Sequence, residues 1–253
     1  MMYQEFSVIY ESKIKEDFDY KQMADFILQQ LRKASIKPQY VLDMGCGTGN
    51  ASAQLVRYCD EMVLCDPSAE MLTLAREKFE NPYCPIFLQG NAVDFEMVGR
   101  FDLIFSVLDI PNYLNQEELK AYLKQSWINL KPKGLMIFDL SSGLKLKESA
   151  QVGTFVYDDE DYFHVWDNNL IDGRLEITIN AFLKQQEHSK KGADDLYERI
   201  IEEQVMHLHS TEMIEEEARK VGFKIRGSYD GYTNAASDDQ TKRLVYVLEK
   251  GEN

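Results

Sequence analysis

Three glycines, Gly45, Gly47 and Gly49, separate a short apolar run from a segment with helical spacing. The run at 40–44 indicates a buried strand, and the segment at about 51–58 indicates a helix. Glycine accepts positive φ and lets a ligand approach the backbone, while the first turn of a helix offers free amide groups. The stretch therefore predicts an α/β fold with a ligand bound at the turn; a plain tight turn is the alternative interpretation.

Strand and helix spacing alternate between residues 20 and 140. Helical period occurs in three further segments, at 20–31, at 116–130 and from a cap at Ser68 to about 79. Short apolar runs typical of buried strands lie at 62–65, 86–88, 103–107 and 135–138. This alternation predicts a doubly wound, mostly parallel sheet whose ligand lies at the carboxyl ends of the strands.

The spacing changes after Ser141. Alternation of apolar and polar residues indicates antiparallel strands at 154–157, 162–166, 174–183 and 197–209. A helix resumes from Ser210, and two strands follow it near 223–229 and 244–248. We therefore expect a Rossmann-like domain with a seven-stranded sheet, residues 1–142 and 210–253, interrupted by an antiparallel β insertion at 143–209.

The charge balance and the apolar runs exclude several classes of protein. Lys and Arg total 28 against 43 Asp and Glu, and the net charge of −15 disfavours nucleic acid as a partner. No apolar run approaches the ~20 residues needed to span a bilayer, and residues 1–10 lack the pattern of a secretory signal. The four cysteines match no metal or redox motif, so we expect a cytoplasmic protein.

Two carboxylates follow the first two predicted strands. The dinucleotide-binding fingerprint needs a third glycine where Asn50 stands, which disfavours a nicotinamide dehydrogenase. Asp43, just before the glycines, would repel a pyrophosphate and attract an ammonium group, as in the tail of an amino acid. Asp66 ends the second strand, where a carboxylate can accept both hydroxyls of a ribose; a cap for the next helix is its alternative role.

Taken together, these features resemble the class I S-adenosylmethionine-dependent methyltransferases. The resemblance covers about residues 20–140. Its matching segments are Val41–Asn50, Leu64–Ser68 with Met71 and Leu72, Gln89–Ala92, Phe101–Phe105, Asn112–Leu114 and Leu130–Leu135. The resemblance implies that the cofactor is S-adenosyl-L-methionine and that the reaction needs no metal.

The resemblance also implies a position for each matching residue. Those expected at the methionine part of the cofactor are Asp43, Gly45, Cys46, Gly47 and Gly49. Those expected at the ribose and the adenine are Asp66, Pro67, Met71, Asn91 and Ala92. Leu108 and Asp109 would border the sulfonium. Many of these enzymes carry an acidic residue where Asn91 stands, and the amide oxygen of Asn91 can still accept a hydrogen bond.

The insertion after the fifth strand resembles that of a subgroup acting on small molecules, such as glycine and amino-sugar N-methyltransferases. In this subgroup the insertion covers the acceptor pocket, and a tyrosine near the amino terminus covers the cofactor. Tyr10 and Tyr20 are the candidates for that tyrosine, and a place in the core is the alternative.

Methyl transfer from a sulfonium requires an aligned nucleophile and the exclusion of water, and an amine acceptor must also lose a proton. We expect Asp109, Asn112 and Tyr113, which follow the fourth strand, to be the catalytic residues. Further candidates are Asp139, His164, Trp166, Glu203 and His207. His207 and His209 alternate on a predicted strand as two metal ligands would, but no third ligand has a suitable spacing, so we predict no metal site.

The leading hypothesis is a methyltransferase that acts on a small polar metabolite, with an amine as a candidate acceptor. An RNA or protein methyltransferase and a non-catalytic S-adenosylmethionine-binding protein are the alternatives. The acceptor and the oligomeric state stay open at this stage.

Overall fold

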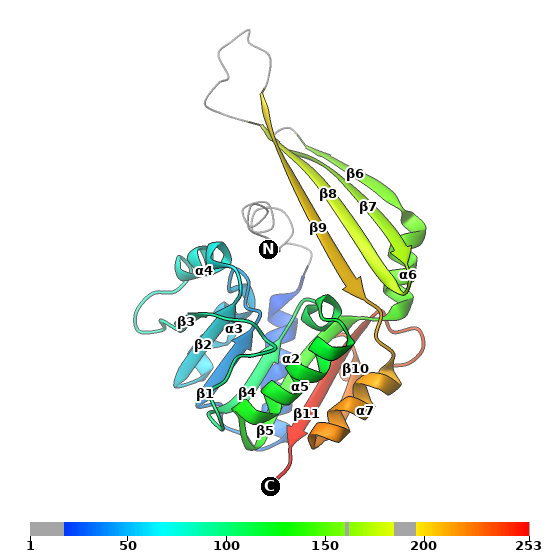
Figure 1. Ribbon diagram of the computed structural model, residues 1–253. Helices are drawn as coiled ribbons and strands as arrows, with labels where there is room; N and C mark the ends of the chain where they lie inside the picture. Colours follow the sequence, from blue (N-terminus) through cyan, green and yellow to red (C-terminus); the bar gives the residue numbers. More distant parts are fainter. Residues whose placement is uncertain (1–17, 160–161, 185–195, 253) are drawn as a thin grey trace.

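In the computed structural model, which describes residues 18–159, 162–184 and 196–252, the larger of two sheets has seven strands in the order β10-β11-β5-β4-β1-β2-β3 (Figure 1). The strands are β1 Tyr40–Met44, β2 Glu61–Asp66, β3 Ile86–Gln89, β4 Phe101–Ser106, β5 Leu130–Ser141, β10 Phe223–Asp230 and β11 Arg243–Lys250. Strands β1 to β5 pair in parallel, whereas β11 is antiparallel to β5 and β10. The sheet is therefore mostly parallel, as expected.

Helices cover both faces of this sheet (Figure 1). They are α2 Tyr20–Lys33, α3 Asn50–Leu55 and α4 Ala69–Arg76 on one face, and α5 Gln116–Asn129 and α7 Thr211–Val221 on the other. Neighbouring strand residues enter different cores: Val41 packs in the core that contains α2, and Leu42 packs in the core that contains α5. Strands buried on both faces account for the continuous apolar runs in the sequence.

Capping residues fix the ends of several helices. Ser68 caps α4, as expected, because its hydroxyl accepts from the amide of Met71 at 3.1 Å. Asn115 and Glu118 form a capping box at the start of α5. Gly222 ends α7 in the left-handed region, with φ of 111°. The ends of these helices are therefore fixed by contacts local in the sequence.

The smaller sheet is antiparallel, has the order β6-β7-β8-β9, and lies in sequence between β5 and α7, as expected. Its strands are β6 Thr154–Asp159, β7 Tyr162–Ile171, β8 Arg174–Lys184 and β9 Tyr197–His207. The pairing places Trp166, Ile179 and Glu202 side by side on one face. We call this face, which packs on helix α6 (Gly143–Val152) and on Tyr113, the inner face of the insertion.

Some boundaries differ from the sequence-based expectation. Helix α6 lies in a segment for which the spacing predicts no element, because Leu146 is its one buried residue and no apolar stripe forms. Strand β5 begins at Leu130, so Pro132 and Gly134, expected to precede the strand, lie within it. Helix α4 ends at Arg76 rather than near 79, and the 3-10 turn η3 (Val56–Tyr58) completes the helix expected at 51–58.

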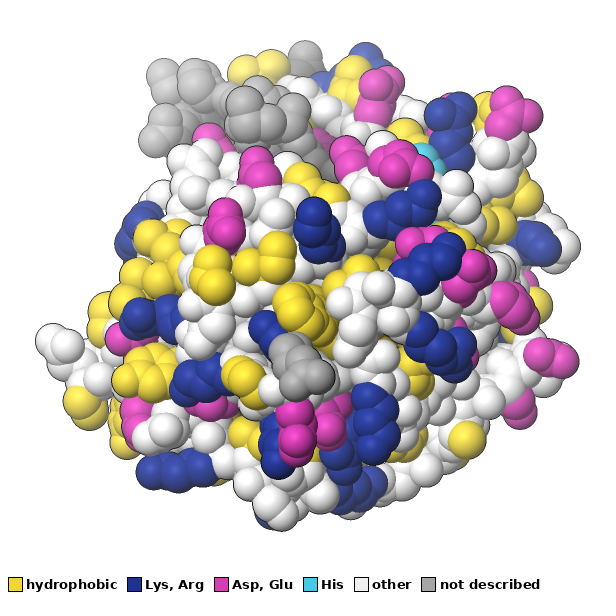
Figure 2. Space-filling view, turned by 60° about the horizontal axis from the view of Figure 1, so that its bottom comes forward, with side chains coloured by type: hydrophobic (Ala, Val, Ile, Leu, Met, Phe, Trp, Pro, Cys, Tyr) yellow, Lys and Arg dark blue, Asp and Glu magenta, His cyan; other side chains and the backbone are white. Residues whose placement is uncertain are grey.

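Charged side chains of both signs are mixed on the face around the carboxyl-terminal strand (Figure 2). Lys220 pairs with Glu216 at 2.8 Å, and Lys133 pairs with Glu252 at 2.7 Å. The visible basic residues of this face thus alternate with acidic ones rather than forming a track. Within the described ranges, no helix has the length and apolar character needed to cross a membrane.

We predict that Phe138→Ala lowers the free energy of unfolding by about 3–5 kcal/mol, because a large buried ring is lost. The Phe138 ring is fully buried and stacks on Tyr246 with 5.3 Å between centroids. Urea denaturation followed by circular dichroism measures the change. Val98→Ala removes part of a side chain that is 69% exposed and serves as the control. A loss for Phe138→Ala no larger than that of the control would contradict this packing.

Candidate functional site

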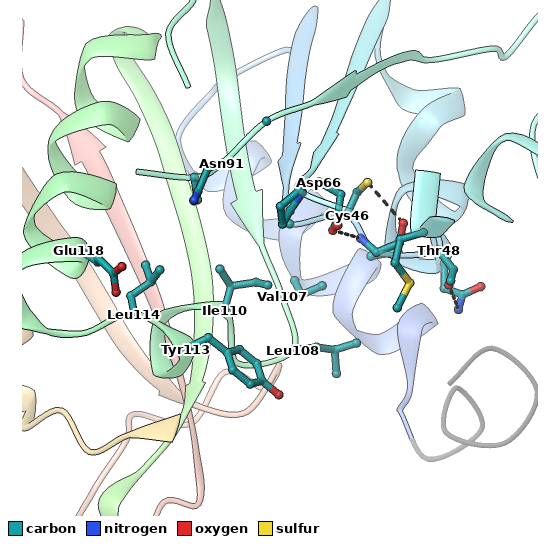
Figure 3. A pocket seen from close by; sticks show the side chains of 18 of the residues that line it. Cys46, Thr48, Asp66, Asn91, Val107, Leu108, Ile110, Tyr113, Leu114 and Glu118 are labelled. Atoms are coloured by element: carbon teal, nitrogen blue, oxygen red, sulfur yellow. Dashed lines mark hydrogen bonds between the residues drawn. The ribbon is translucent and has the colours of Figure 1, made fainter. Parts of the chain in front are cut away.

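A cavity of about 270 Å³ lies at the carboxyl ends of β1, β2 and β4 (Figure 3). The lining residues that were expected from the sequence are Tyr20, Gly45, Cys46, Gly47, Asp66, Pro67, Met71, Asn91, Ala92, Leu108 and Tyr113. The other lining residues are Thr48, Asn50, Ala51, Gly90, Val107, Ile110, Leu114 and Glu118. One cavity therefore gathers most of the residues expected to bind the cofactor.

The glycine turn forms one wall of the cavity. The amides of Gly45 and Cys46 donate to the carbonyl oxygen of Cys65 at 2.8 and 3.1 Å, which ties the turn to β2. Gly45 has φ of 81°, and a Cβ at this position would lie 2.6 Å from Cδ1 of Ile110. Glycine is therefore required here both by the backbone conformation and by the close approach of the loop after β4.

The carboxylate of Asp66 lines the cavity at the end of β2 and has a fixed orientation. Its Oδ2 accepts from the amide of Gly47 at 2.8 Å, and its Oδ1 accepts from the amide of Ser68 at 2.9 Å. Burial raises the pKa of Asp66, and the two amide hydrogen bonds oppose this shift. Each carboxylate oxygen keeps a second lone pair, so the group can still accept two hydroxyl donors.

Asp43 lies behind the glycine turn and is not a lining residue of the cavity. Its carboxylate is fully buried, and the hydroxyl of Ser52 donates to Oδ2 at 2.5 Å. Within the described part of the chain, Oδ1 of Asp43 has no hydrogen-bond partner. Burial raises the pKa of Asp43 to about 7, and the neighbouring Asp66 carboxylate acts in the same direction. Asp43 can therefore change its charge near neutral pH.

The remaining residues expected at the cofactor fall into three groups. Asn91 and Ala92 line the cavity after β3, and Tyr20 lines it at the start of α2. Gly49 has φ of 78° and caps α3 without lining the cavity. Tyr10 lies outside the described residues. Tyr20 therefore lines the cavity and also packs against the core, so it stays the candidate for the covering tyrosine.

Asp109 and Asp139, two of the expected acidic groups, pair with a cation rather than lining the cavity. Arg243 Nη1 donates to Oδ1 of Asp109 at 3.1 Å and to Oδ2 of Asp139 at 2.7 Å. The hydroxyl of Ser141 donates to Oδ1 of Asp109 at 3.0 Å. This geometry does not favour proton transfer from an acceptor to Asp109.

Asn112 and Tyr113 belong to η4 (Ile110–Tyr113), the short turn after β4, and differ in their surroundings. Asn112 is fully buried, and its amide donates to the carbonyl oxygens of Ser141 and His207 at 3.1 and 3.0 Å. Tyr113 lines the cavity, and its hydroxyl donates to Oε1 of Gln204 at 3.3 Å. Of the three residues expected to be catalytic, Tyr113 is the one that faces the cavity (Figure 3).

The other candidates lie on the insertion. Trp166 and His164 are on the inner face. Glu203 and His207 are on the opposite face, because successive strand residues point to opposite sides. Nδ1 of His164 lies 2.5 Å from the hydroxyl of Tyr162. Burial lowers the pKa of His164, and burial together with Arg174 lowers that of His207. Both imidazoles are therefore neutral near pH 7 and can accept a proton.

His209 has a structural position. Its Nε2 lies 3.0 Å from the carbonyl oxygens of both Pro111 and Leu114, so this nitrogen carries the proton and donates. The rings of His207 and His209 stack with centroids 6.2 Å apart. In the described ranges, no group of three or more His, Cys, Asp or Glu side chains is arranged to hold a metal ion.

Sequence reasoning missed several lining residues. Glu118 lines the cavity, but its carboxylate also accepts from the amide of Asn115, so the helix start alone accounts for it. Ile110 and Leu114 are apolar and flank the expected Tyr113. The one feature of the sequence that could have indicated them is their position just after the predicted fourth strand, since ligands bind at the carboxyl ends of such strands.

Comparisons with known proteins agree with this geometry. A model of a methyltransferase domain matches residues 41–134. The protein named "Putative methyltransferase YqeM" of Bacillus subtilis (strain 168) is 26% identical over 99% of this chain and 98% of its own. The crystal structure of an S-adenosylmethionine-dependent methyltransferase from Clostridium acetobutylicum has a TM-score of 0.87 and 30% identity, covering 98% of this chain and 99% of that one. CalS10, an amino pentose methyltransferase from Micromonospora echinaspora, shares the fold with a TM-score of 0.72 and 15% identity over 96% of each chain.

We predict that Asp43→Asn changes the pH dependence of stability. The pKa of Asp43 is about 7 in the folded protein and 3.8 ordinarily, so between these values the unfolded chain ionises more readily. Ionisation of Asp43 therefore lowers the wild-type free energy of unfolding as the pH rises through this window. Asn does not titrate, so the stability of the variant relative to wild type should increase from about pH 4 to about pH 7 and then level off.

Urea denaturation at a series of pH values measures this difference. Asp25→Asn is the control, because Asp25 is exposed and lies on the outer surface of α2. A relative stability of Asp43→Asn that stays constant over the same pH range would show that Asp43 is not a perturbed carboxyl group.

Proposed function

Because the chain belongs to the class I S-adenosylmethionine-dependent methyltransferases, we propose that it methylates a small polar metabolite, with an amine nitrogen as the acceptor atom. The observation that carries this proposal is the hydrogen bond from Tyr113, in the cavity, to Gln204, on the inner face of the insertion. An acceptor held against the inner face would lie beside the cofactor. CalS10, which shares the fold over nearly the whole chain, is an amino pentose methyltransferase.

The residues around the cavity fit S-adenosylmethionine. The two free lone pairs of Asp66 suit the ribose hydroxyls, and the backbone of the glycine turn suits the carboxylate of the methionine tail. Asp43 lies directly behind this turn, where its negative charge attracts the ammonium group without touching it. Asn91 and the amide of Ala92 are assigned to the adenine. Met71, Pro67 and Leu108 supply apolar lining, with Leu108 at the sulfonium end.

Catalysis requires this chain to align an acceptor and to remove water. When bound, S-adenosylmethionine supplies an activated methyl group on a cationic sulfur. Tyr113 lies where the cavity meets the insertion and orients the acceptor through its hydroxyl. Neutral His164, on the inner face of the insertion, is the candidate to take the amine proton, directly or through water. Trp166 adds an aromatic surface on the inner face.

A nucleic-acid acceptor is less favoured by charge. The net charge of −15 repels phosphates. A small cavity bordered by an insertion sheet suits a metabolite better than an extended polymer.

We predict that Asp66→Ala weakens binding of S-adenosylhomocysteine by about 10- to 100-fold, because two hydrogen bonds to a charged acceptor are lost. Isothermal titration calorimetry measures the dissociation constant. Asp25→Ala, which removes an exposed carboxylate on α2, is the matched control and should bind like wild type. Equal affinities in Asp66→Ala and the control would place the ribose elsewhere. Stabilisation of wild type by NAD, but not by S-adenosylhomocysteine, would contradict the cofactor assignment.

We predict that Tyr113→Phe lowers turnover by about tenfold and leaves S-adenosylhomocysteine affinity unchanged, because one hydroxyl on the acceptor side is removed. Mass spectrometry of S-adenosylhomocysteine formation with panels of small amines, tRNA and proteins measures turnover. Tyr58→Phe is the control, since Tyr58 is 51% exposed, belongs to η3 and does not line the cavity. Methylation of tRNA or protein but of no amine would overturn the proposed acceptor class.

A further inference from the structure

Two consecutive residues at the cavity wall adopt a backbone conformation that is unfavourable for residues other than glycine. Leu108 and Asp109 have φ values of 63° and 68°, in the left-handed region. This conformation is unfavourable for a residue with a side chain, Leu108 above all, and persists where the surroundings impose it. Leu108 and Ile110, the residue that follows the pair, line the cavity. The shape of this wall therefore depends on the contacts that hold Leu108 and Asp109 in the left-handed conformation.

The strained pair is held by an ionic cluster centred on Arg243. The amide of Asp109 donates to Oδ1 of Asp139 at 2.8 Å, which places the partly buried Asp109 beside the fully buried Asp139. Arg243 donates to both carboxylates, and the hydroxyl of Tyr232 donates to Oδ2 of Asp139 at 2.8 Å. Without the guanidinium, the two neighbouring carboxylates would repel each other and separate.

Arg243 also supports a second wall of the cavity. Its guanidinium lies over the ring of Phe18, 5.5 Å from the centroid. Phe18 in turn packs edge-on against Tyr20 with 4.8 Å between centroids, and Tyr20 lines the cavity. Arg243, on β11, therefore contacts both Asp109, next to the Leu108 wall, and Phe18, next to the Tyr20 wall. Arg243 itself does not line the cavity.

We propose that Arg243 is a positioning residue for the cofactor, acting through Asp109 on the Leu108 wall and through Phe18 on the Tyr20 wall. This inference rests on the proposed function of the cavity. It concerns the part of the cavity formed by the loop after β4 and by α2, and not the part formed by Asp66 and Asn91. Loss of Arg243 should therefore weaken binding of the amino-acid tail more than binding of the nucleoside.

The variant that tests this is Arg243→Met, and the chain offers a closely matched control in Arg100→Met. Arg100 also pairs with a carboxylate, Glu61, and also lies over an aromatic ring, that of Tyr40, at 5.3 Å. Arg100 lies at the amino ends of β2 and β4, whereas the cavity lies at their carboxyl ends, and Arg100 does not line the cavity. Both variants remove a pairing cation, but only one removes it behind the cavity.

The measurement is calorimetric titration of each protein with S-adenosylhomocysteine and with adenosine, alongside its thermal midpoint. We expect Arg243→Met to bind S-adenosylhomocysteine at least tenfold more weakly and adenosine within about threefold of wild type, and Arg100→Met to bind both like wild type. Arg243→Lys, which keeps the charge but cannot bridge two carboxylates, should fall between Arg243→Met and wild type. A purely structural role would lower the thermal midpoint without changing the ratio of the two affinities.

Wild-type affinity for S-adenosylhomocysteine in Arg243→Met, or an equal loss for both ligands in both variants, would overturn the inference. If Arg243→Met does not fold, Asp109→Asn decides the question, because it keeps the size of the side chain and breaks its charged pairing. A wild-type ratio of S-adenosylhomocysteine affinity to adenosine affinity in Asp109→Asn would equally overturn the inference. Failure of the wild type to bind S-adenosylhomocysteine would instead refute the proposed function.

Discussion

The hydrogen bond from the amide of Gly47 to the carboxylate of Asp66 joins the two features on which the cofactor site depends. Parallel pairing of β1 and β2 brings their carboxyl ends to one edge, so the glycine turn and the carboxylate meet without any long side chain between them. Ser68 holds the second oxygen and also starts α4. Strand register, turn conformation and helix capping thus converge on one carboxylate.

The insertion is attached to this site by buried polar contacts rather than by a flexible connection. Asn112 bonds to the backbone of both β5 and the end of β9, and His209 bonds to two carbonyl oxygens around η4. Tyr113, between them, reaches the inner face of the insertion. Since breaking such buried bonds is costly, the acceptor side and the wall of the cofactor cavity keep a fixed relation.

The sequence predicted the parallel sheet because strands buried on both faces leave continuous apolar runs. It also predicted that Asp66 stands at the end of a strand, because this residue follows such a run. Helix α6 escaped prediction because one buried residue leaves no period to detect. The surroundings of Asp109 escaped it for a different reason: its partner Arg243 is 134 residues away, and no local pattern encodes that pairing. For Asn112, the sequence likewise predicted a position after the fourth strand, but it did not predict the hydrogen bond to the carbonyl oxygen of His207 on β9.

The position of β11 in the sheet has a consequence for how the site matures. This strand follows every other described strand in sequence, yet it inserts between β10 and β5. Pairing of distant segments forms late, because closing the intervening chain costs entropy before any contact rewards it. A chain in which β1 to β5 have already assembled therefore has the glycine turn and the Asp66 carboxylate, but lacks Arg243, the cation that pairs with Asp109 beside the cavity. Tight binding of the cofactor would then require that the whole fold, including β11, has formed.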